Sequence, residues 1–330
     1  MKKSITLAEG NGGAENQAFI KEIFWRHLGN EILDRGEDAA LIEGENLAFT
    51  TDSFTVSPLF FPGGDIGKLS VCGTCNDLAM MGARPKYLSL SVIIEEGFES
   101  RSVEKIVRSI KKELEVNGAM IVTGDTKVVP RGSVDEIFIN TSGIGEREAD
   151  GISVSSIEKG DLLIVSGDIG RHGAAIFAKR EGIELKSAIR SDCASLWPVV
   201  DALLKKGIKP HAMRDATRGG VAAVLNEWAQ ASNLCMEVEE ESIPVSEEVR
   251  GICEILGFEA TALANEGTFM LALSDREAKK ALDILKGFDK NAAVIGVAGE
   301  SYPGRVVLKS EWGTKRFMDL PTGELLPRIC

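Results

Sequence analysis

Six aspartates lie at or near the predicted ends of strands and helices, each beside small residues that would let a ligand approach the backbone. They are Asp38, Asp52, Asp77, Asp125, Asp168 and Asp215. Hard cations such as Mg²⁺ take oxygen ligands and usually bridge to the phosphates of a substrate. The aspartates therefore predict a magnesium site that handles phosphate. The residues alone leave open the alternative that they are ordinary turn and capping residues.

Two glycine-containing segments precede predicted helices, at residues 167–173 and 215–220. Free N–H groups at the start of a helix attract phosphate, so both segments could hold part of a nucleotide. Neither has the spacing of a dinucleotide fingerprint. Residues 62–69 lack the Ser or Thr that a Walker motif requires. The sequence thus indicates phosphate binding without a standard nucleotide loop.

Cys72 and Cys75 form a C-G-T-C pair that could be a redox dithiol or half of a zinc site. No second Cys/His pair completes a tetrahedral set, so two small core or interface residues are the plainer interpretation. Among the three histidines only His172, in a glycine-containing loop, is a site candidate, and a helix-capping role fits it equally well.

Cys330 is the last residue of the sequence. A prenylation motif needs three residues after its cysteine, so we expect no lipid anchor here. A thiol at the end of a flexible tail is suited to carry a covalently attached group into an active site. The alternative is an incidental exposed cysteine.

The composition of the chain excludes several classes of function. The chain has 330 residues and 44% apolar content, enough for two domains that each bury a core. Its 38 basic and 50 acidic residues leave a net charge of −12, which argues against nucleic acid as a partner. No long apolar run or signal-peptide pattern occurs, and six cysteines are too sparse for a disulfide scaffold. We expect a cytoplasmic protein that binds neither nucleic acid nor membrane.

The elements that must position these residues follow from apolar periodicity. Helical patterns cover residues 14–28, 66–81, 102–117, 174–179, 196–205, 220–231 and 278–285. Strand patterns cover residues 37–42, 47–52, 87–94, 119–123, 137–141, 161–165, 235–238, 268–273, 292–297 and 305–308. Ser102 is expected to cap the third helix. The periodicity lapses at residues 145–159, which predicts domains at 1–150 and 151–312. It is lost again beyond Trp312, which predicts a flexible tail at 313–330.

Several segments together carry a family resemblance that runs along essentially the whole chain. They are residues 51–54 (TDSF), 73–83 (GTCNDLAMMGA), 123–128 (TGDTKV), 167–168 with 172–175, 214–220 (RDATRGG) and the terminal 327–330 (PRIC). These segments resemble the HypE family of hydrogenase maturation proteins. That family belongs to the superfamily of aminoimidazole ribonucleotide synthetase, selenophosphate synthetase and thiamine-monophosphate kinase. The terminal PRIC is the most specific signal.

The resemblance implies a mixed α/β (α+β) fold with two domains of the aminoimidazole ribonucleotide synthetase type. The N-terminal domain would bind ATP and form a β-barrel with its mate in a homodimer. The C-terminal domain would be an α/β sandwich that covers the nucleotide cleft, followed by the tail that carries Cys330.

The resemblance also implies an activity, an ATP-dependent carbamoyl dehydratase. The carbamoyltransferase HypF would load Cys330 with a carbamoyl group, which MgATP would then dehydrate to a thiocyanate, giving ADP and phosphate. The cyano group would pass to the iron of the [NiFe] hydrogenase cofactor through a HypC–HypD complex. The open alternatives are another ATP-dependent enzyme of the superfamily that acts on a diffusible small molecule, and a thiol-based scaffold without catalysis.

Site residues are carried over by the same resemblance. The implied metal ligands are Asp38, Asp52, Asp77, Asp125 and Asp215. The implied nucleotide contacts are Gly12, Gly13, Thr51, Asp52, Asp77, Gly124, Asp125 and Lys127. The implied catalytic groups are Cys330, Lys127, Glu266 and Arg218. Lys127 and Glu266 would polarise the carbamoyl carbonyl and take the N–H protons, with an ordinary Lys–Glu ion pair as the alternative. Arg218 would stabilise transferred charge.

Overall fold

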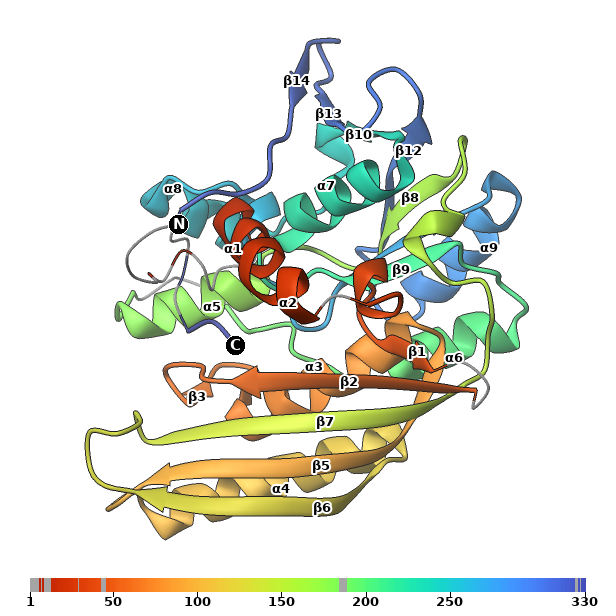
Figure 1. Ribbon diagram of the computed structural model, residues 1–330. Coiled ribbons are helices and arrows are strands. Elements are labelled where there is room, and N and C mark those ends of the chain that lie inside the picture. The colour runs from red at the N-terminus through yellow and green to blue at the C-terminus, as the bar shows by residue number, and fades with distance from the viewer. Residues whose placement is uncertain are drawn as a thin grey trace.

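The computed structural model describes residues 6, 8, 13–28, 30–42, 46–183, 189–323, 326 and 328–330. Its described residues form two mixed sheets, one five-stranded and one seven-stranded, with a two-stranded ribbon beside them. Figure 1 shows the smaller sheet below and the larger one above, each accompanied by helices. The expected mixed α/β fold with two units is confirmed.

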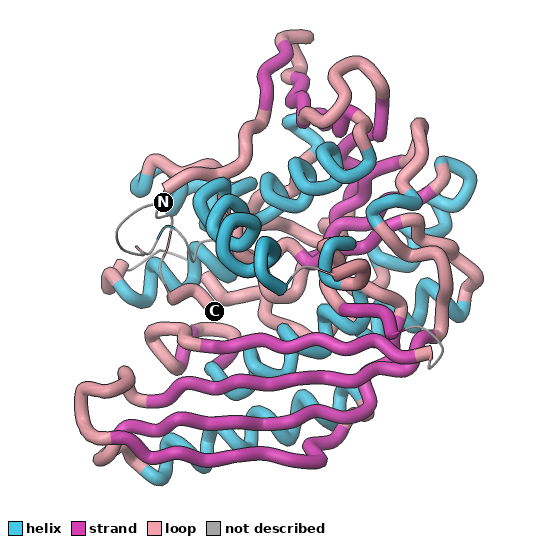
Figure 2. The backbone as a smooth tube through the Cα atoms, in the orientation of Figure 1, coloured by secondary structure: helices cyan, strands magenta, loops and turns pink. Residues whose placement is uncertain are grey.

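The five-stranded sheet has the order β1 (Ala40–Ile42), β2 (Leu47–Phe54), β7 (Ile137–Arg147), β5 (Ala83–Glu95) and β6 (Met120–Val129). All neighbours are antiparallel except β5 and β6, which are parallel because α4 (Ser100–Asn117) crosses between them. Helices α3 and α4 cover one face, and no described helix covers the other (Figures 1 and 2). The sheet of one chain is open, with β6 as an edge strand.

Helix α3 (Ile66–Met80) is buried along nearly its whole length, because it packs against β2, β7 and α4 and also against α6 and β9 of the other half. Glycine makes this close packing possible. A Cβ at Gly67 would stand 2.4 Å from the Ile106 carbonyl oxygen, and one at Gly73 would stand 2.9 Å from the Phe54 ring. Asp65 caps the helix by accepting from the backbone N–H groups of Gly67 and Lys68. Helix α3 thereby joins the two halves.

The seven-stranded sheet runs in the order β14, β13, β10, β12, β8, β11, β9. Its strands are β8 (Leu162–Val165), β9 (Ala212–Asp215), β10 (Cys235–Glu239), β11 (Phe269–Leu273), β12 (Ala293–Gly299), β13 (Val306–Lys309) and β14 (Lys315–Phe317). One face packs on α7 (Gly220–Ser232), and the other on α6 (Trp197–Lys205) and α9 (Asp275–Lys286). Helices α5 (Arg171–Arg180) and α8 (Glu247–Leu256) lie in the core shared with the first half.

The remaining elements are short. A continuous helical run at the N-terminal side comprises α1 (Ala14–Phe19), η2 (Ile20–Trp25) and α2 (Arg26–Leu28). The ribbon pairs β3 (Phe60–Phe61) with β4 (Gly64–Asp65), and single turns form η3 (Leu33–Arg35), η4 (Val154–Ser156), η5 (Glu240–Ser242) and η6 (Ala260–Ala262).

Most of the expected elements are present. Helix α8, the short strands β3 and β4, strands β9 and β14, and the single turns η3 to η6 were not predicted from the sequence. The expected cap at Ser102 is wrong, because α4 begins at Ser100 after Glu99, which makes no side-chain cap bond. Strand β14 lies inside the segment assigned to the tail. The domain bounds and the mobility of the tail stay predictions.

The chain returns to the junction of the two halves after β14. Leu326 and Ile329 are 8% and 5% exposed, and Cys330 is half-buried. In Figure 1 the C-terminus lies between α5 and the smaller sheet. The end of the chain is therefore packed where both halves can contact it.

Candidate active site

Four of the six predicted aspartates gather at the junction of the two halves. Asp38 precedes β1, Asp52 lies on β2, Asp77 on α3, and Asp215 ends β9. Thr50 Oγ1 donates to Asp77 Oδ2 at 2.7 Å. The other two aspartates of the set, Asp125 and Asp168, lie elsewhere, and Asp168 pairs with Arg171 at 2.9 Å.

Arg214 provides a positive charge at this cluster, with its Nε 2.9 Å from Asp38 Oδ1. Even so, burial raises the pKa of Asp38 to about 7. Burial also raises the pKa values of Asp52, Asp77 and Asp215, and the neighbouring carboxylates raise those of Asp77 and Asp215 further. Full ionisation of the cluster is therefore costly, because Arg214 offsets only part of the burial and of the repulsion between the carboxylates.

Two oxygens of the cluster, Asp38 Oδ2 and Asp215 Oδ2, are buried without a hydrogen-bond partner among the described residues. An unpartnered buried carboxylate oxygen is costly, and a bound cation would relieve both the desolvation and the mutual repulsion. The all-oxygen donor set fits Mg²⁺, which keeps several waters and bridges to substrate phosphates. Within the described ranges no group of three or more His, Cys, Asp or Glu side chains is already arranged as a metal cage.

Cys330, Glu266 and Arg218 lie within electrostatic range of one another and of this cluster. Burial raises the pKa of the Cys330 thiol to about 12, the positive charge of Arg218 opposes the rise, and Glu266, Asp52 and Asp215 add to it. Reciprocally, Cys330 is the first cause of a raised pKa at Arg218. The predicted catalytic groups Cys330, Glu266 and Arg218 thus influence one another's charge.

Glu266 is 2% exposed, and its Oε1 has no hydrogen-bond partner in the described part of the chain. Burial, followed by the charges of Asp215, Asp192 and Asp52, raises the pKa of Glu266 well above its ordinary value. A raised pKa makes a carboxylate a stronger proton acceptor, which suits a general base.

Asp192 fixes the backbone at Glu266, and sequence reasoning missed it. The Glu266 N–H donates to Asp192 Oδ1 at 3.1 Å and the Gly267 N–H to Asp192 Oδ2 at 3.0 Å. A Cβ at Gly267 would stand 1.9 Å from the Asp192 carbonyl oxygen, so only glycine fits there. No sequence pattern links residues so far apart in the chain.

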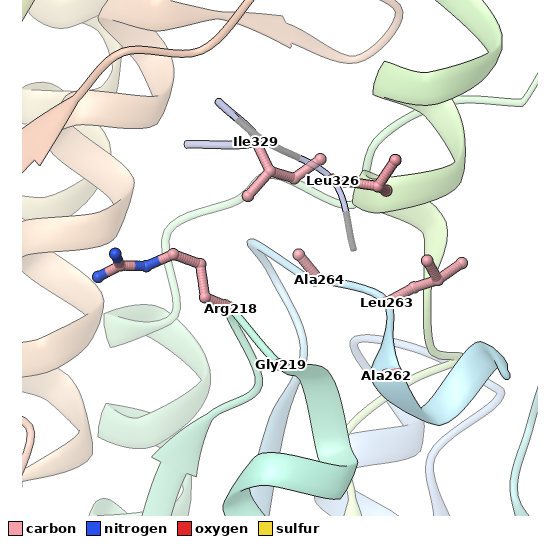
Figure 3. Close-up of a pocket in the computed structure, with 7 residues that line it drawn as sticks. All are labelled: Arg218, Gly219, Ala262, Leu263, Ala264, Leu326 and Ile329. Carbon is pink, nitrogen blue, oxygen red and sulfur yellow. The ribbon is translucent and has the colours of Figure 1, made fainter. Parts of the chain in front are cut away.

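A pocket opens beside the end of the tail (Figure 3). It is lined by Arg218, Gly219, Ala262, Leu263, Ala264, Leu326 and Ile329. In Figure 3 the Ile329 and Leu326 side chains lie over the loop that carries Leu263 and Ala264, while the Arg218 side chain extends to the opposite side. The apolar residues of the tail therefore anchor it next to the charged groups.

The structure does not bring Thr51, Gly124, Asp125 and Lys127 to the aspartate cluster within one chain. Asp125 and Lys127 form an exposed ion pair of 2.8 Å on β6, where the Lys127 ammonium lowers the pKa of Asp125. Strand β6 is three positions from β2 in the sheet, which corresponds to roughly 14 Å.

Strand alternation places Thr51 on the face of the sheet away from α3, where its hydroxyl contacts Ser142 Oγ at 2.9 Å. Gly124 is required for a structural reason, because a Cβ there would stand 2.4 Å from the Leu90 carbonyl oxygen. Gly13 precedes α1 and packs on the Pro321 carbonyl, and Gly12 lies outside the described residues.

Cys72 and Cys75 are both free, fully buried residues of α3. Cys72 Sγ lies 3.8 Å from Glu113 Oε2 and 3.7 Å from Ser195 Oγ, and burial raises the pKa of Cys75. None of the helices in the described ranges combines the length and the apolar content that a membrane span requires.

Comparisons with known proteins match both halves. The family model described as AIR synthase related protein, N-terminal domain, matches residues 36–147, and that for the C-terminal domain matches residues 158–309. The chain is 44% identical to the carbamoyl dehydratase HypE of Escherichia coli K12, over 99% of both chains.

Solved structures agree with that relative. A HypE–HypF complex contains a chain 45% identical to this one, with a TM-score of 0.88 over 92% of this chain and 100% of that one. A HypE structure in complex with ATP is 42% identical, with a TM-score of 0.84 over 99% of this chain and 100% of that one.

Proposed function

The chain belongs to the HypE family of carbamoyl dehydratases, and from that premise we propose that it dehydrates an S-carbamoyl group on its own Cys330 at the expense of ATP. The observation that carries the proposal is the position of the Cys330 thiol beside Arg218, Glu266 and the buried aspartates. A diffusible substrate would not require the chain end to occupy this position.

The reaction needs activation because a carbamoyl oxygen is a poor leaving group. The oxygen attacks the γ-phosphorus of ATP, ADP leaves, and the nitrogen loses one proton to give a phosphorylated imidate. Loss of the second N–H proton then expels phosphate and forms the C≡N bond. The net change converts R–S–CO–NH₂ and ATP into R–S–CN, ADP and phosphate, so the carbamoyl oxygen ends in phosphate.

Glu266 is the proposed base for the N–H protons, because it is close to Cys330 and its raised pKa increases its proton affinity. Arg218 is proposed to stabilise the negative charge that develops on the transferred phosphoryl group. Both residues belong to the second half of the chain, like Cys330, so one subunit would supply this part of the site.

The ATP phosphates would lie over Asp38, Asp52, Asp77 and Asp215. When bound there, Mg²⁺ would neutralise charge on the phosphates. The two unpartnered oxygens of Asp38 and Asp215 support this assignment. The relative solved with ATP supports the nucleotide.

A homodimer would complete the site. The open face of the small sheet carries a row of directly paired, exposed apolar residues, formed by Phe49, Ile144, Tyr87 and Met120. We propose that this face and the β6 edge close into a barrel with a second copy, since large exposed apolar rows mark interfaces. The partner would then bring its own Gly124, Asp125 and Lys127 to the nucleotide.

Other partners follow from the family. The relative solved with HypF supports a HypF-like carbamoyltransferase as the donor of the carbamoyl group. We propose a HypC–HypD complex as the acceptor of the cyano group for the hydrogenase iron. The free state of all six cysteines suits a reducing compartment, which supports a cytoplasmic location.

The test is the mass of the C-terminal peptide after incubation with the carbamoyltransferase, carbamoyl phosphate and MgATP. We expect a carbamoyl adduct on Cys330 that loses one water only when MgATP is present, and no adduct in Cys330→Ala. An unmodified tail, with the transferase active on a control HypE, would refute the proposal. It would favour a superfamily enzyme with a diffusible substrate.

A further inference from the structure

His172 is a buried side chain that the chemistry above does not use. It is the second residue of α5, is 0% exposed, and both of its ring nitrogens are engaged. Nε2 lies 2.7 Å from the Ile329 carbonyl oxygen, and Nδ1 lies 2.8 Å from Ser191 Oγ. Helix α5 has Gly170 as its N-cap and no side-chain cap bond, so His172 does not cap the helix.

The two partners define the tautomer of His172. A carbonyl oxygen only accepts, so Nε2 must carry the proton and donate to Ile329. Nδ1 of the neutral ring then accepts from the Ser191 hydroxyl. That hydroxyl oxygen itself accepts from the Cys193 N–H at 3.0 Å, which leaves its hydrogen for the ring. Burial lowers the pKa of His172, which favours this neutral form.

His172 binds the middle one of three consecutive tail residues, 328 to 330, whose backbone carbonyl oxygens all accept hydrogen bonds. The Arg328 carbonyl accepts from the Ser57 N–H at 3.2 Å and from Arg180 Nη2 at 3.1 Å. A carboxyl-group oxygen of Cys330 accepts from Thr55 N–H at 2.9 Å. The Ile329 carbonyl belongs to the peptide bond that enters Cys330, so the His172 contact helps to fix the direction of the thiol.

Ser191 connects the tail to the proposed base. The next residue, Asp192, holds the backbone N–H groups of Glu266 and Gly267. Two consecutive loop residues, Ser191 and Asp192, therefore position both the His172 ring and Glu266. Displacement of the ring would move the thiol relative to the base without touching either group.

We propose that His172, held as its Nε2–H tautomer by Ser191, is a positioning residue that binds the Ile329 carbonyl and places Cys330 beside Glu266 and Arg218. Its catalytic consequence rests on the proposed function, but the holding of the tail does not. The two parts can therefore be tested separately.

The first test is the alkylation rate of Cys330, measured by mass spectrometry of the C-terminal peptide of the full-length protein. The docked thiol is half-buried with a raised pKa, and the other five cysteines are buried, so the wild-type rate should be slow. His172→Phe keeps an aromatic ring but loses the donor. We expect about a tenfold faster reaction of Cys330, as lost hydrogen bonds of this kind cost about one decade in an equilibrium.

Three further variants sharpen this test. His172→Gln retains an N–H donor and should recover part of the slow rate, which a purely structural role would not predict. Ser191→Ala removes the hydroxyl that fixes the tautomer of His172 and should give an intermediate alkylation rate. This variant also keeps the proposal testable if His172→Phe fails to fold. His211→Gln, which alters a half-buried histidine bound to Asp161, is the matched control and should react like wild type.

The second test is single-turnover loss of water from carbamoylated Cys330. His172→Phe should slow it while leaving the affinity for ATP unchanged. Wild-type alkylation rates in folded His172→Phe and Ser191→Ala, or equal effects of Phe and Gln, would overturn the positioning role. A different result would refute only the proposed function: Cys330 reacts slowly in the wild type and faster in these variants, but the wild type does not dehydrate the carbamoyl group.

Discussion

Two regions of the molecule place aspartates with similar sequence neighbours in opposite environments, one buried and one exposed. The cluster of Asp38, Asp52, Asp77 and Asp215 is buried at the junction of the halves, with raised pKa values and two unpartnered oxygens. Asp125 on β6 is solvent-exposed, paired with Lys127, and has a lowered pKa. The first group is electrostatically unfavourable until a cation or ligand binds, whereas the second is already satisfied and available to a partner.

The comparison predicts that removing the buried base has the largest effect. Glu266→Gln should slow dehydration of carbamoylated Cys330 by about 100-fold or more, because a general base contributes that much. Single-turnover mass spectrometry of the C-terminal peptide measures it. Glu259→Gln, a change at an exposed ion pair with Arg316, is the control and should retain the wild-type rate. A Glu266→Gln rate within a factor of three of wild type would exclude Glu266 as the base.

Subunit mixing tests whether the exposed pair acts across a dimer. Lys127→Ala and Cys330→Ala should each be inactive or nearly so when alone. Mixed in equal amounts with random exchange, half of the dimers would carry one complete site, so about a quarter of the wild-type activity should return. If no activity returns in demonstrably mixed dimers, Lys127 and Cys330 do not meet across a subunit boundary.

Without ligands, the buried cluster should lower the stability of the protein, whereas the exposed pair should not, and Mg²⁺ should relieve the repulsion within the cluster. We expect MgATP to raise the melting temperature of wild type by several degrees, by linkage to the folded state. Without Mg²⁺, Asp77→Asn should be more stable than wild type, since the substitution removes a buried repulsive charge. With MgATP, the melting temperature of this variant should rise much less than that of wild type. Asp125→Asn should show no measurable change in melting temperature without ligands, as expected for an exposed pair. If the two variants change the melting temperature equally in a thermal scan, the buried cluster and the exposed pair do not differ in the way proposed.

The smallest expected effect is a pH dependence. The folded pKa of Asp38 is raised from 3.8 to about 7, so between those values the folded state binds more protons than the unfolded state. Stability from this group is therefore fully present below pH 3.8 and decreases as the pH rises toward 7. Without Mg²⁺, Asp38→Asn should flatten the fall in melting temperature between pH 5 and 7 relative to wild type. A slope that is unchanged in this variant would contradict the raised pKa.

The sequence predicted much of the fold because its elements have clear periodicity. The amphipathic stripe of α4 and the apolar run of α3 identify helices with little help from the rest of the chain. Strand β9 was missed because it has only four residues and carries Arg214 and Asp215 between apolar neighbours. Its identity as a strand depends on pairing with β11, which is distant in sequence.

For the site, too, the sequence indicated one part and the tertiary structure decided the other. The residue types and the terminal cysteine indicated carboxylates for a phosphate-bound cation and a thiol carrier, and the family resemblance added the glutamate base. Only the tertiary structure decided which of these residues meet. It joined Cys330, Glu266, Arg218 and four aspartates, and left Asp125 and Lys127 on an open edge. It also showed that His172, a candidate from the sequence, contacts the Ile329 carbonyl, and it revealed Asp192, which holds the backbone of Glu266. Such contacts join residues 74 to 157 positions apart, so no local pattern encodes them.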